Sequence, residues 1–115
     1  MKRFKESHSH DERLNESNKI MNRYPERIPI IVEKAKGCRL ARLSKNKYLA
    51  PKDMTMSQFV FMVRKRIQLE PSEAMFLMVN HSLVNGSALI GQIYTDHKES
   101  DGFLYMIYTS ENTFG

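Results

Sequence analysis

The sequence predicts an α+β fold in which one long helix packs across a small sheet. Two segments with β-type alternation precede the most amphipathic helical stretch, at residues 56–67, and two further apolar segments follow it. The chain has 115 residues, of which 41% are hydrophobic and 27% are charged. These values are typical of one folded domain, so we expect a single structural domain rather than a disordered chain.

The first 24 residues predict a helix that docks on a larger body. Ser9 and Glu12 have the spacing of a capping box, in which each side chain satisfies a backbone amide of the first turn. The helix should end near Tyr24, because Pro25 disfavours helical geometry at the residue before it. Its apolar stripe is thin, so we expect residues 1–24 to form a helical subdomain packed on the core.

The next two segments predict a pair of strands. Residues 27–33 alternate, with positions 28, 30 and 32 on one face and positions 29 and 31 on the other. Lys36 and Gly37 mark a turn, and residues 47–50 form a second strand that Pro51 closes. Proline and flanking lysines are typical of an edge strand.

The central helix has the strongest local pattern of the chain. Thr55 and Gln58 form a second capping box, and Phe59, Val63 and Ile67 recur at helical spacing. Pro71 prevents the helix from continuing. We therefore expect one amphipathic helix whose apolar face covers the sheet.

The C-terminal part predicts two strands around a short helix. Residues 75–79 have the pattern of a buried strand, and we expect Ser87 to cap a short helix with Leu89, Ile93 and Tyr94 inward. Residues 103–108 are apolar on both faces, which is typical of a central strand. This order is that of a ubiquitin-like β-grasp over residues 25–109, with an extra N-terminal helical segment and a polar tail at 110–115.

Composition and charge narrow the class of function. No apolar run approaches the roughly 20 residues of a membrane span, and no apolar stretch of a signal peptide follows the N-terminus. Cys38 is the only cysteine, which favours a reducing compartment. Residues 34–66 hold ten Lys/Arg against one acid, a surface suited to nucleic acid, anionic lipid or an acidic peptide.

Neither an enzyme nor a metal site is expected. The four histidines lack metal-ligand spacing, and no base-and-orienter pair accompanies Cys38. We therefore expect no catalytic residue, no metal and no cofactor.

Several long motifs, in order along the chain, then resemble one family. The motifs are Arg23-Tyr24-Pro25-Glu26-Arg27-Ile28-Pro29-Ile30-Ile31-Val32-Glu33-Lys34, Lys47-Tyr48-Leu49-Ala50-Pro51-Lys52-Asp53-Met54-Thr55, Gln58-Phe59, Arg64-Lys65-Arg66-Ile67, Asp101-Gly102-Phe103-Leu104-Tyr105 and Phe114-Gly115. Through these motifs the chain is similar to the autophagy ubiquitin-like modifiers, the family of light chain 3 and the GABA-receptor-associated protein.

The resemblance implies chemistry at the C-terminal glycine. The carboxylate of Gly115 would be adenylated, passed as a thioester between the cysteines of activating and conjugating enzymes, and joined to the amine of phosphatidylethanolamine. Glycine lacks a side chain, so its carboxylate can enter a narrow enzyme cleft. Phe114 would be the residue that these enzymes recognise beside it.

The resemblance also implies a peptide-binding site at the edge strand, for partners with a W/F/Y-x-x-L/I/V motif that acids often precede. The aromatic side chain would enter a pocket made by Glu16, Ile20, Pro29, Lys47, Leu49 and Phe103. The aliphatic side chain would enter a pocket made by Tyr48, Ala50, Pro51, Met54, Phe59, Met62, Val63 and Arg66. The flanking acids would meet Arg27, Lys45, Lys47 and Arg66. For Phe59 and Val63, a plain core position is an equal alternative.

The implied partners are cargo receptors, the activating and conjugating enzymes, a delipidating cysteine protease and a phosphatidylethanolamine membrane; the family also suggests tubulin. The implied location is the cytoplasm, then the autophagosome membrane after lipid attachment, with the vacuole or lysosome as a further destination.

Two alternative functions stay open: a ubiquitin-fold peptide-binding scaffold that is never conjugated, and a basic nucleic-acid-binding module. No helix-turn-helix, zinc-finger or RRM pattern supports the second, so no nucleic acid is expected as a partner.

Overall fold

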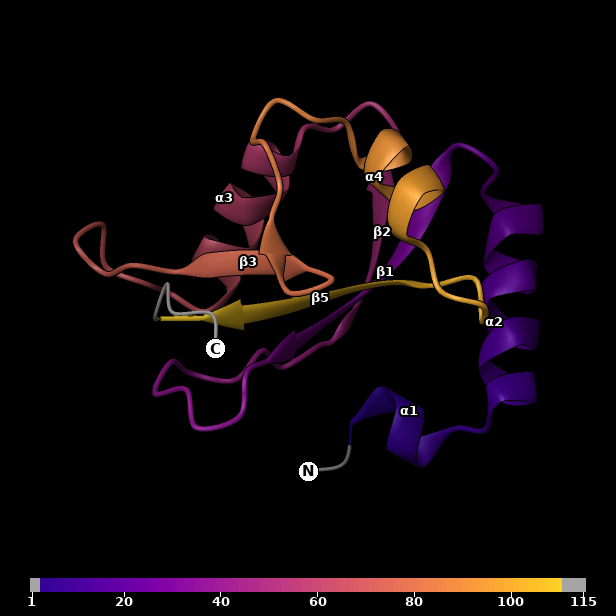
Figure 1. The fold of residues 1–115 in the computed structure, drawn as a ribbon, viewed down its shortest axis with the longest axis horizontal. Coiled ribbons are helices and arrows are strands. Elements are labelled where there is room, and N and C mark those ends of the chain that lie inside the picture. The colour runs from indigo at the N-terminus through magenta and orange to yellow at the C-terminus, as the bar shows by residue number, and fades with distance from the viewer. Residues whose placement is uncertain (1–2, 111–115) are drawn as a thin grey trace.

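The computed structural model describes residues 3–110 of the chain, as a five-stranded sheet with four helices around it (Figure 1). The elements, in order, are α1 (Phe4–Ser7), α2 (His10–Arg23), β1 (Arg27–Lys34), β2 (Lys47–Pro51), α3 (Met56–Arg66), β3 (Phe76–Val79), β4 (Ser82–Leu83), α4 (Ile90–His97) and β5 (Leu104–Thr109).

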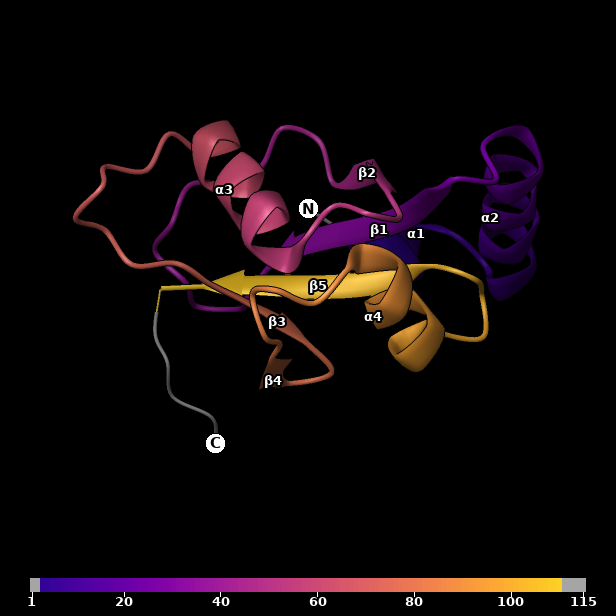
Figure 2. The same ribbon diagram turned by 90° about the horizontal axis from the view of Figure 1, so that it is seen from above.

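The strands lie in the order β2-β1-β5-β3-β4, as Figure 2 shows from above. β1 and β5 are parallel, whereas the other neighbouring pairs are antiparallel. β2 is therefore an edge strand and β5 a central one, as the sequence predicted. The α+β architecture with an added N-terminal helical segment is likewise confirmed.

The main core lies between the sheet and α3. Ile28, Ile30 and Val32 of β1 face it together with the even-numbered residues of β5. From α3, Phe59 and Val63 are fully buried against this face. The alternation that predicted β1 thus assigns its side chains to the correct faces.

The opposite face of the sheet is covered by a smaller cluster that includes α1, a helix that the sequence did not predict. Phe4 is buried beside Ile31 and Phe103, and its ring centroid lies 5.2 Å from that of Phe103. Ile20 of α2 and Tyr105 of β5 pack against these three residues. Figure 1 shows α1 and α3 on opposite sides of the sheet.

A buried carboxylate fastens α2 to the start of β5. Asp101 accepts a hydrogen bond from the Tyr105 hydroxyl at 2.6 Å and forms an ion pair with Arg13 at 3.2 Å. The Ser17 hydroxyl donates to the Asp101 backbone carbonyl at 2.6 Å. Two residues of α2 therefore hold the side chain and the backbone of Asp101. These polar contacts dock α2 in one position although its apolar stripe is thin.

Both predicted capping boxes are present, at Ser9 with Glu12 and at Thr55 with Gln58. The prediction for α4 was wrong in two respects. Leu89 is the N-cap residue and is exposed, because an isolated β-bridge to Thr55 holds it in extended conformation. The Ser87 hydroxyl donates to Asn85 instead, within the turn before the helix. Ile90 and Ile93 are the buried residues of α4.

Within residues 3–110, no helix is long and apolar enough to cross a membrane. In the same part of the chain, no three His, Cys, Asp or Glu side chains gather as they would to hold a metal ion.

Candidate functional site

The candidate site is the outer edge of β2. Among the described residues β2 pairs with β1 alone, through an antiparallel register that sets Leu49 opposite Pro29 and Tyr48 opposite Ile30. The backbone groups on its other side face away from the sheet. An added strand could bond to such groups.

Successive side chains of β2 point to different parts of the molecule. Lys47 and Leu49 lie opposite Ile31 and Pro29, on the face that α1 and α2 cover. Tyr48 and Ala50 are buried in the main core, on the α3 face. A peptide that extended the sheet here would therefore meet two different surroundings with alternate side chains.

On the α2 side, a charged pair lies over an aromatic floor. The Lys47 ammonium forms an ion pair with Glu16 of α2 and lies 5.5 Å from the ring centroid of Phe4. Ile20 packs against the same cluster, in which Phe103 is fully buried. The predicted set Glu16, Ile20, Pro29, Lys47, Leu49 and Phe103 thus spans α2, β1, β2 and the residue before β5.

On the α3 side, the predicted residues are a buried floor with half-buried neighbours. Phe59 and Val63 have 0% exposure, and the ring of Tyr48 meets that of Phe59 edge-on at 6.2 Å between centroids. Met54 and Met62 are half-buried and pack against this core. Phe59 and Val63 are therefore core residues; a ligand would first meet the more exposed members, Pro51, Met54, Met62 and Arg66.

Two cations flank the Tyr48 ring. The Arg66 guanidinium lies 5.9 Å and the Lys45 ammonium 6.0 Å from the ring centroid. The Tyr48 hydroxyl donates to the Lys45 carbonyl at 2.6 Å, which holds the end of the β1–β2 loop beside the ring. Burial raises the pKa of Tyr48, and Arg66 partly opposes that rise. The tyrosine is therefore neutral near pH 7, and the cations supply the charge.

The fourth predicted acid contact lies elsewhere. Arg27 is opposite Pro51 at the far end of the β1–β2 pair, whereas Lys47 is opposite Ile31. The structure thus gathers Lys45, Lys47 and Arg66 near one end of β2 and leaves Arg27 at the other. An acidic residue next to the peptide motif would meet the first group or Arg27, depending on its position.

Sequence reasoning missed Phe4 as a part of this site. Its ring lies beneath the Lys47 ammonium and contacts Phe103, so it completes the floor of the α2 side. The available signal was a single aromatic residue in a polar, charged segment. Phe114 and Gly115, the residues expected to take part in conjugation, lie outside the described residues.

Comparison with known proteins supports the assignment that the residues suggest. The family model described as "Autophagy protein Atg8 ubiquitin like" matches residues 12–115. The chain is 49% identical over 115 residues to Autophagy-related protein 8h of Arabidopsis thaliana, with 100% of this chain and 97% of the relative covered. It is 47% identical over 112 residues to Autophagy-related protein 8 of Mycosarcoma maydis, with 97% and 95% covered.

The likeness extends to the three-dimensional structure. The crystal structure of ATG8 from Trypanosoma brucei matches with a TM-score of 0.90 and 41% sequence identity, and the match covers 100% of this chain and 99% of that one. The family model matches residues 12–115, and the relatives and the solved structure cover 97–100% of the chain. The chain belongs to the Atg8 family of autophagy-related ubiquitin-like proteins.

Proposed function

We propose that this protein is a ubiquitin-like modifier that is joined through Gly115 to phosphatidylethanolamine and recruits cargo receptors through the edge of β2. The observation that carries the recruitment step is the unpaired edge, whose alternate side chains point toward α2 and toward α3. A short extended peptide gains backbone hydrogen bonds from such an edge and specificity from the two sides.

The site favours a particular peptide chemistry. An aromatic side chain suits the α2 side, where Phe4, Ile20 and Phe103 form an apolar floor. An aliphatic side chain suits the α3 side, where adaptable methionines surround the core. Acidic residues beside the motif would pair with Lys45 and Arg66, which have no carboxylate partner within residues 3–110. The motif W/F/Y-x-x-L/I/V with adjoining acids meets all three conditions.

Conjugation rests on the family membership. The Gly115 carboxylate would react with ATP to form an acyl adenylate and release pyrophosphate. An enzyme thiol would then displace AMP, and the amine of phosphatidylethanolamine would displace the thiol to leave an amide. The protein would thus be the substrate of these enzymes and not an enzyme, and it would act in the cytoplasm and on the autophagosome membrane.

Conjugation is tested by the intact mass of the protein after incubation with cognate activating and conjugating enzymes, ATP and phosphatidylethanolamine vesicles. We expect a gain of one lipid minus one water that requires ATP and is absent in Gly115→Ala. No gain, with enzymes that modify another family member, would leave a peptide-binding scaffold that is never conjugated as the better description.

Peptide binding is tested by calorimetry with an acid-flanked W-x-x-L peptide. We expect a dissociation constant in the range of roughly micromolar, because the contact area is small. Arg66→Glu should weaken binding by at least about tenfold, because it places like charges together.

Lys65→Glu is the matched control for Arg66→Glu. It makes the same charge change at the neighbouring position of α3, where the Lys65 ammonium lies over the Phe61 ring and not beside Tyr48. Equal weakening by both variants would show that the peptide binds to general positive charge rather than to the edge of β2.

A further inference from the structure

The loop between β1 and β2, together with the last residue of β1 and the first residue of β2, is strongly basic, and the peptide site uses only its last part. Residues 34–47 contain six cations and no acid: Lys34, Lys36, Arg39, Arg42, Lys45 and Lys47. Lys45 and Lys47 lie at the edge of β2. The remaining four have no role in the function proposed above.

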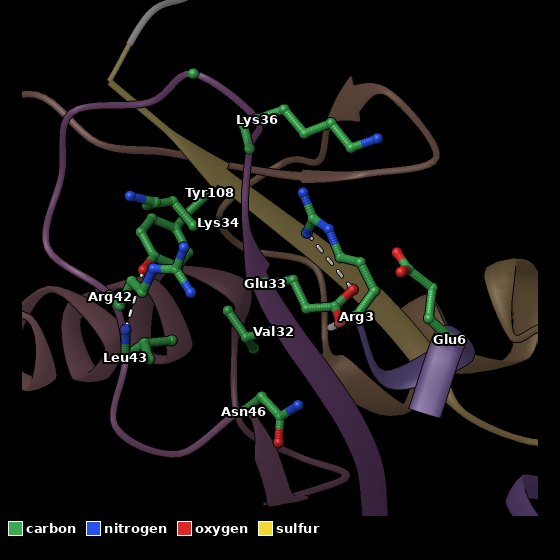
Figure 3. Close-up of a pocket in the computed structure, with 12 residues that line it drawn as sticks. Arg3, Glu6, Val32, Glu33, Lys34, Lys36, Arg42, Leu43, Asn46 and Tyr108 are labelled. Atoms are coloured by element: carbon green, nitrogen blue, oxygen red, sulfur yellow. Dashed lines mark hydrogen bonds and ion pairs between the residues drawn. The ribbon is translucent and has the colours of Figure 1, made fainter. Parts of the chain in front are cut away.

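Part of this loop lines a pocket of about 300 Å³, which we call the basic pocket and define by Arg3, Lys34, Lys36, Arg42 and Tyr108. Figure 3 shows Lys34 and Arg42 beside the Tyr108 ring on one side of the pocket, with Arg3 on the other. The volume is at the small end of ligand-binding sites, so a compact ligand is the one to expect.

The floor of the basic pocket is rigid. The Tyr108 hydroxyl donates to the Ala41 carbonyl at 2.7 Å and accepts from the Leu43 amide at 3.1 Å. These two bonds tie the loop to β5. Because Tyr108 itself is almost fully buried, its ring forms the floor of the pocket and cannot stack on a ligand. A ligand would therefore be bound by the charged groups of the lining.

Those charged groups leave an excess of positive charge. Glu33 accepts a hydrogen bond from the Phe4 amide at 2.8 Å and forms an ion pair with Arg3 at 3.7 Å, so Arg3 neutralises its negative charge. The Lys34 ammonium donates to the neutral Leu40 carbonyl at 3.1 Å. Within residues 3–110, no carboxylate pairs with Lys36 or Arg42. Glu6 is the one other acid of the lining.

An anion with several oxygens matches this arrangement. A guanidinium binds phosphate oxygens through two parallel hydrogen bonds, and an ammonium adds a point charge. A phosphate monoester carries between one and two negative charges near pH 7, and the lining offers it Lys34 and Arg42 on one side of β1 and Lys36 on the other (Figure 3). The chemistry therefore favours a phosphate monoester over a carboxylate or a neutral ligand.

The place of the basic pocket in the fold indicates where that phosphate comes from. β1 and β5 are parallel, so the loop leaves the sheet at the end where β5 stops (Figure 1). The Ala35 amide donates to the Tyr108 carbonyl at 2.8 Å, and Cys38 Sγ lies 4.0 Å from Ser110 Oγ. Gly115 lies five positions after Ser110, and a fully extended chain of five residues spans at most about 18 Å. A lipid joined to Gly115 would therefore hold the membrane surface close to this pocket.

We propose that the basic pocket binds the phosphate monoester of an anionic lipid headgroup, in the membrane to which the protein is attached. This inference rests on the proposed function for its membrane and for the side from which the lipid approaches. A lipid anchor combined with a basic patch holds a protein on a membrane more strongly than either alone. Headgroup binding would also fix the orientation of the protein, with the β1–β2 loop toward the bilayer.

The test uses the full-length, unconjugated chain and sedimentation with three kinds of vesicle. One contains phosphatidylcholine alone, one adds a phosphatidylinositol monophosphate, and one adds enough phosphatidylserine to give the same surface charge. We expect the tightest binding to the monophosphate vesicles. Lys36→Gln combined with Arg42→Gln should weaken it by at least about tenfold, since each change removes a charge-assisted hydrogen bond to the phosphate.

Lys19→Gln combined with Lys98→Gln is the matched control. Both residues are exposed, one on α2 and one after α4, away from the β1–β2 loop, and the double change removes the same charge. Binding to monophosphate vesicles should stay within twofold of the unmodified chain. An equal loss in both double variants, or equal binding to phosphatidylserine vesicles, would overturn the pocket in favour of diffuse attraction.

A soluble inositol phosphate separates the two sources of the phosphate. It should compete only at concentrations far above those of the accessible lipid, because it lacks the membrane. Binding of the free compound as tight as that of the vesicle would show a site for a soluble ligand and overturn the lipid assignment. Conjugation is scored separately, by intact mass on vesicles without the monophosphate, so that its failure and the failure of the basic pocket give different results.

Discussion

At the scale of single residues, Gly102 shows how closely α2 is fitted to the sheet. Its φ is +84°, and a Cβ at this position would collide with the Ser17 hydroxyl, which is bonded to the neighbouring Asp101 carbonyl. Gly102→Ala should therefore lower the free energy of unfolding by more than the roughly 1–2 kcal/mol that left-handed backbone alone costs an alanine.

Gly37→Ala is the control for Gly102→Ala. Gly37 has a similar φ of +76°, but no atom lies within 4 Å of an added Cβ. Urea unfolding of both variants should give the larger loss at position 102. Equal losses would mean that backbone conformation accounts for the whole effect, and that the Ser17 side chain can move aside without lowering the free energy of unfolding.

Tyr105 gives the fold a dependence on alkaline pH. Burial raises its pKa well above the usual value of 10.0, and the bond to the buried Asp101 carboxylate adds to the rise. The folded state therefore keeps the phenol proton after the unfolded chain has begun to lose it. Its contribution to stability is complete below about pH 10 and falls as the pH rises beyond that value.

Between pH 10 and 12, the free energy of unfolding should decrease less steeply for Tyr105→Phe than for the unmodified protein. Urea titrations at several pH values measure both slopes. All other side chains are the same in both proteins, so the difference between the slopes isolates Tyr105. Identical slopes would contradict the raised pKa.

At the scale of elements, the capping boxes mark where the two longest helices begin. The Thr55 hydroxyl accepts from the Gln58 amide at 3.2 Å, and the Gln58 side chain accepts from the Thr55 amide at 2.9 Å. Thr55→Ala should destabilise the protein by about 1 kcal/mol. Thr55→Ser should recover most of that loss in thermal unfolding, because it restores the acceptor; a serine variant as unstable as the alanine one would locate the effect elsewhere.

Elements with a strong local signal were predictable from the sequence, and the others were not. Capping boxes and apolar periodicity gave α2, α3, β1 and β5 with boundaries close to those observed. α1 has only four residues and one apolar side chain, and Phe4 becomes buried only because Phe103, 99 positions later, provides its partner. The burial of Ile90 instead of Leu89 in α4 depends on a bridge between distant residues, which no local pattern reveals.

The features of the candidate site were likewise predictable only where they have a local signal or a family motif in the sequence. The edge position of β2 followed from its lysines and proline, and the resemblance supplied the residues on both sides of it. The sequence did not reveal that Phe59 and Val63 are wholly core, that Lys47 is held by Glu16, or that Arg27 lies apart from the other cations. Each of these depends on how α2, α3 and the two strands meet in space.

At the scale of the whole molecule, the sheet depends on its last strand. β5 lies between β1 and β3, so its loss would separate the N-terminal hairpin from the β3–β4 pair. Removal of residues 104–115 should therefore abolish the cooperative thermal transition seen by circular dichroism. Removal of residues 111–115 alone should preserve it, since β5 ends at Thr109. A cooperative transition in the shorter chain would show that the hairpin and α3 form a stable unit by themselves.

The same central strand has a consequence for biosynthesis. Most contacts that complete the sheet join residues near 30 to residues near 105, and such long-range pairing forms slowly. A growing polypeptide can form α2, α3 and the β1–β2 hairpin on the ribosome, but it must wait for β5 before its core can close. Until then the flank of β1 that β5 will cover stays open to pairing with other chains.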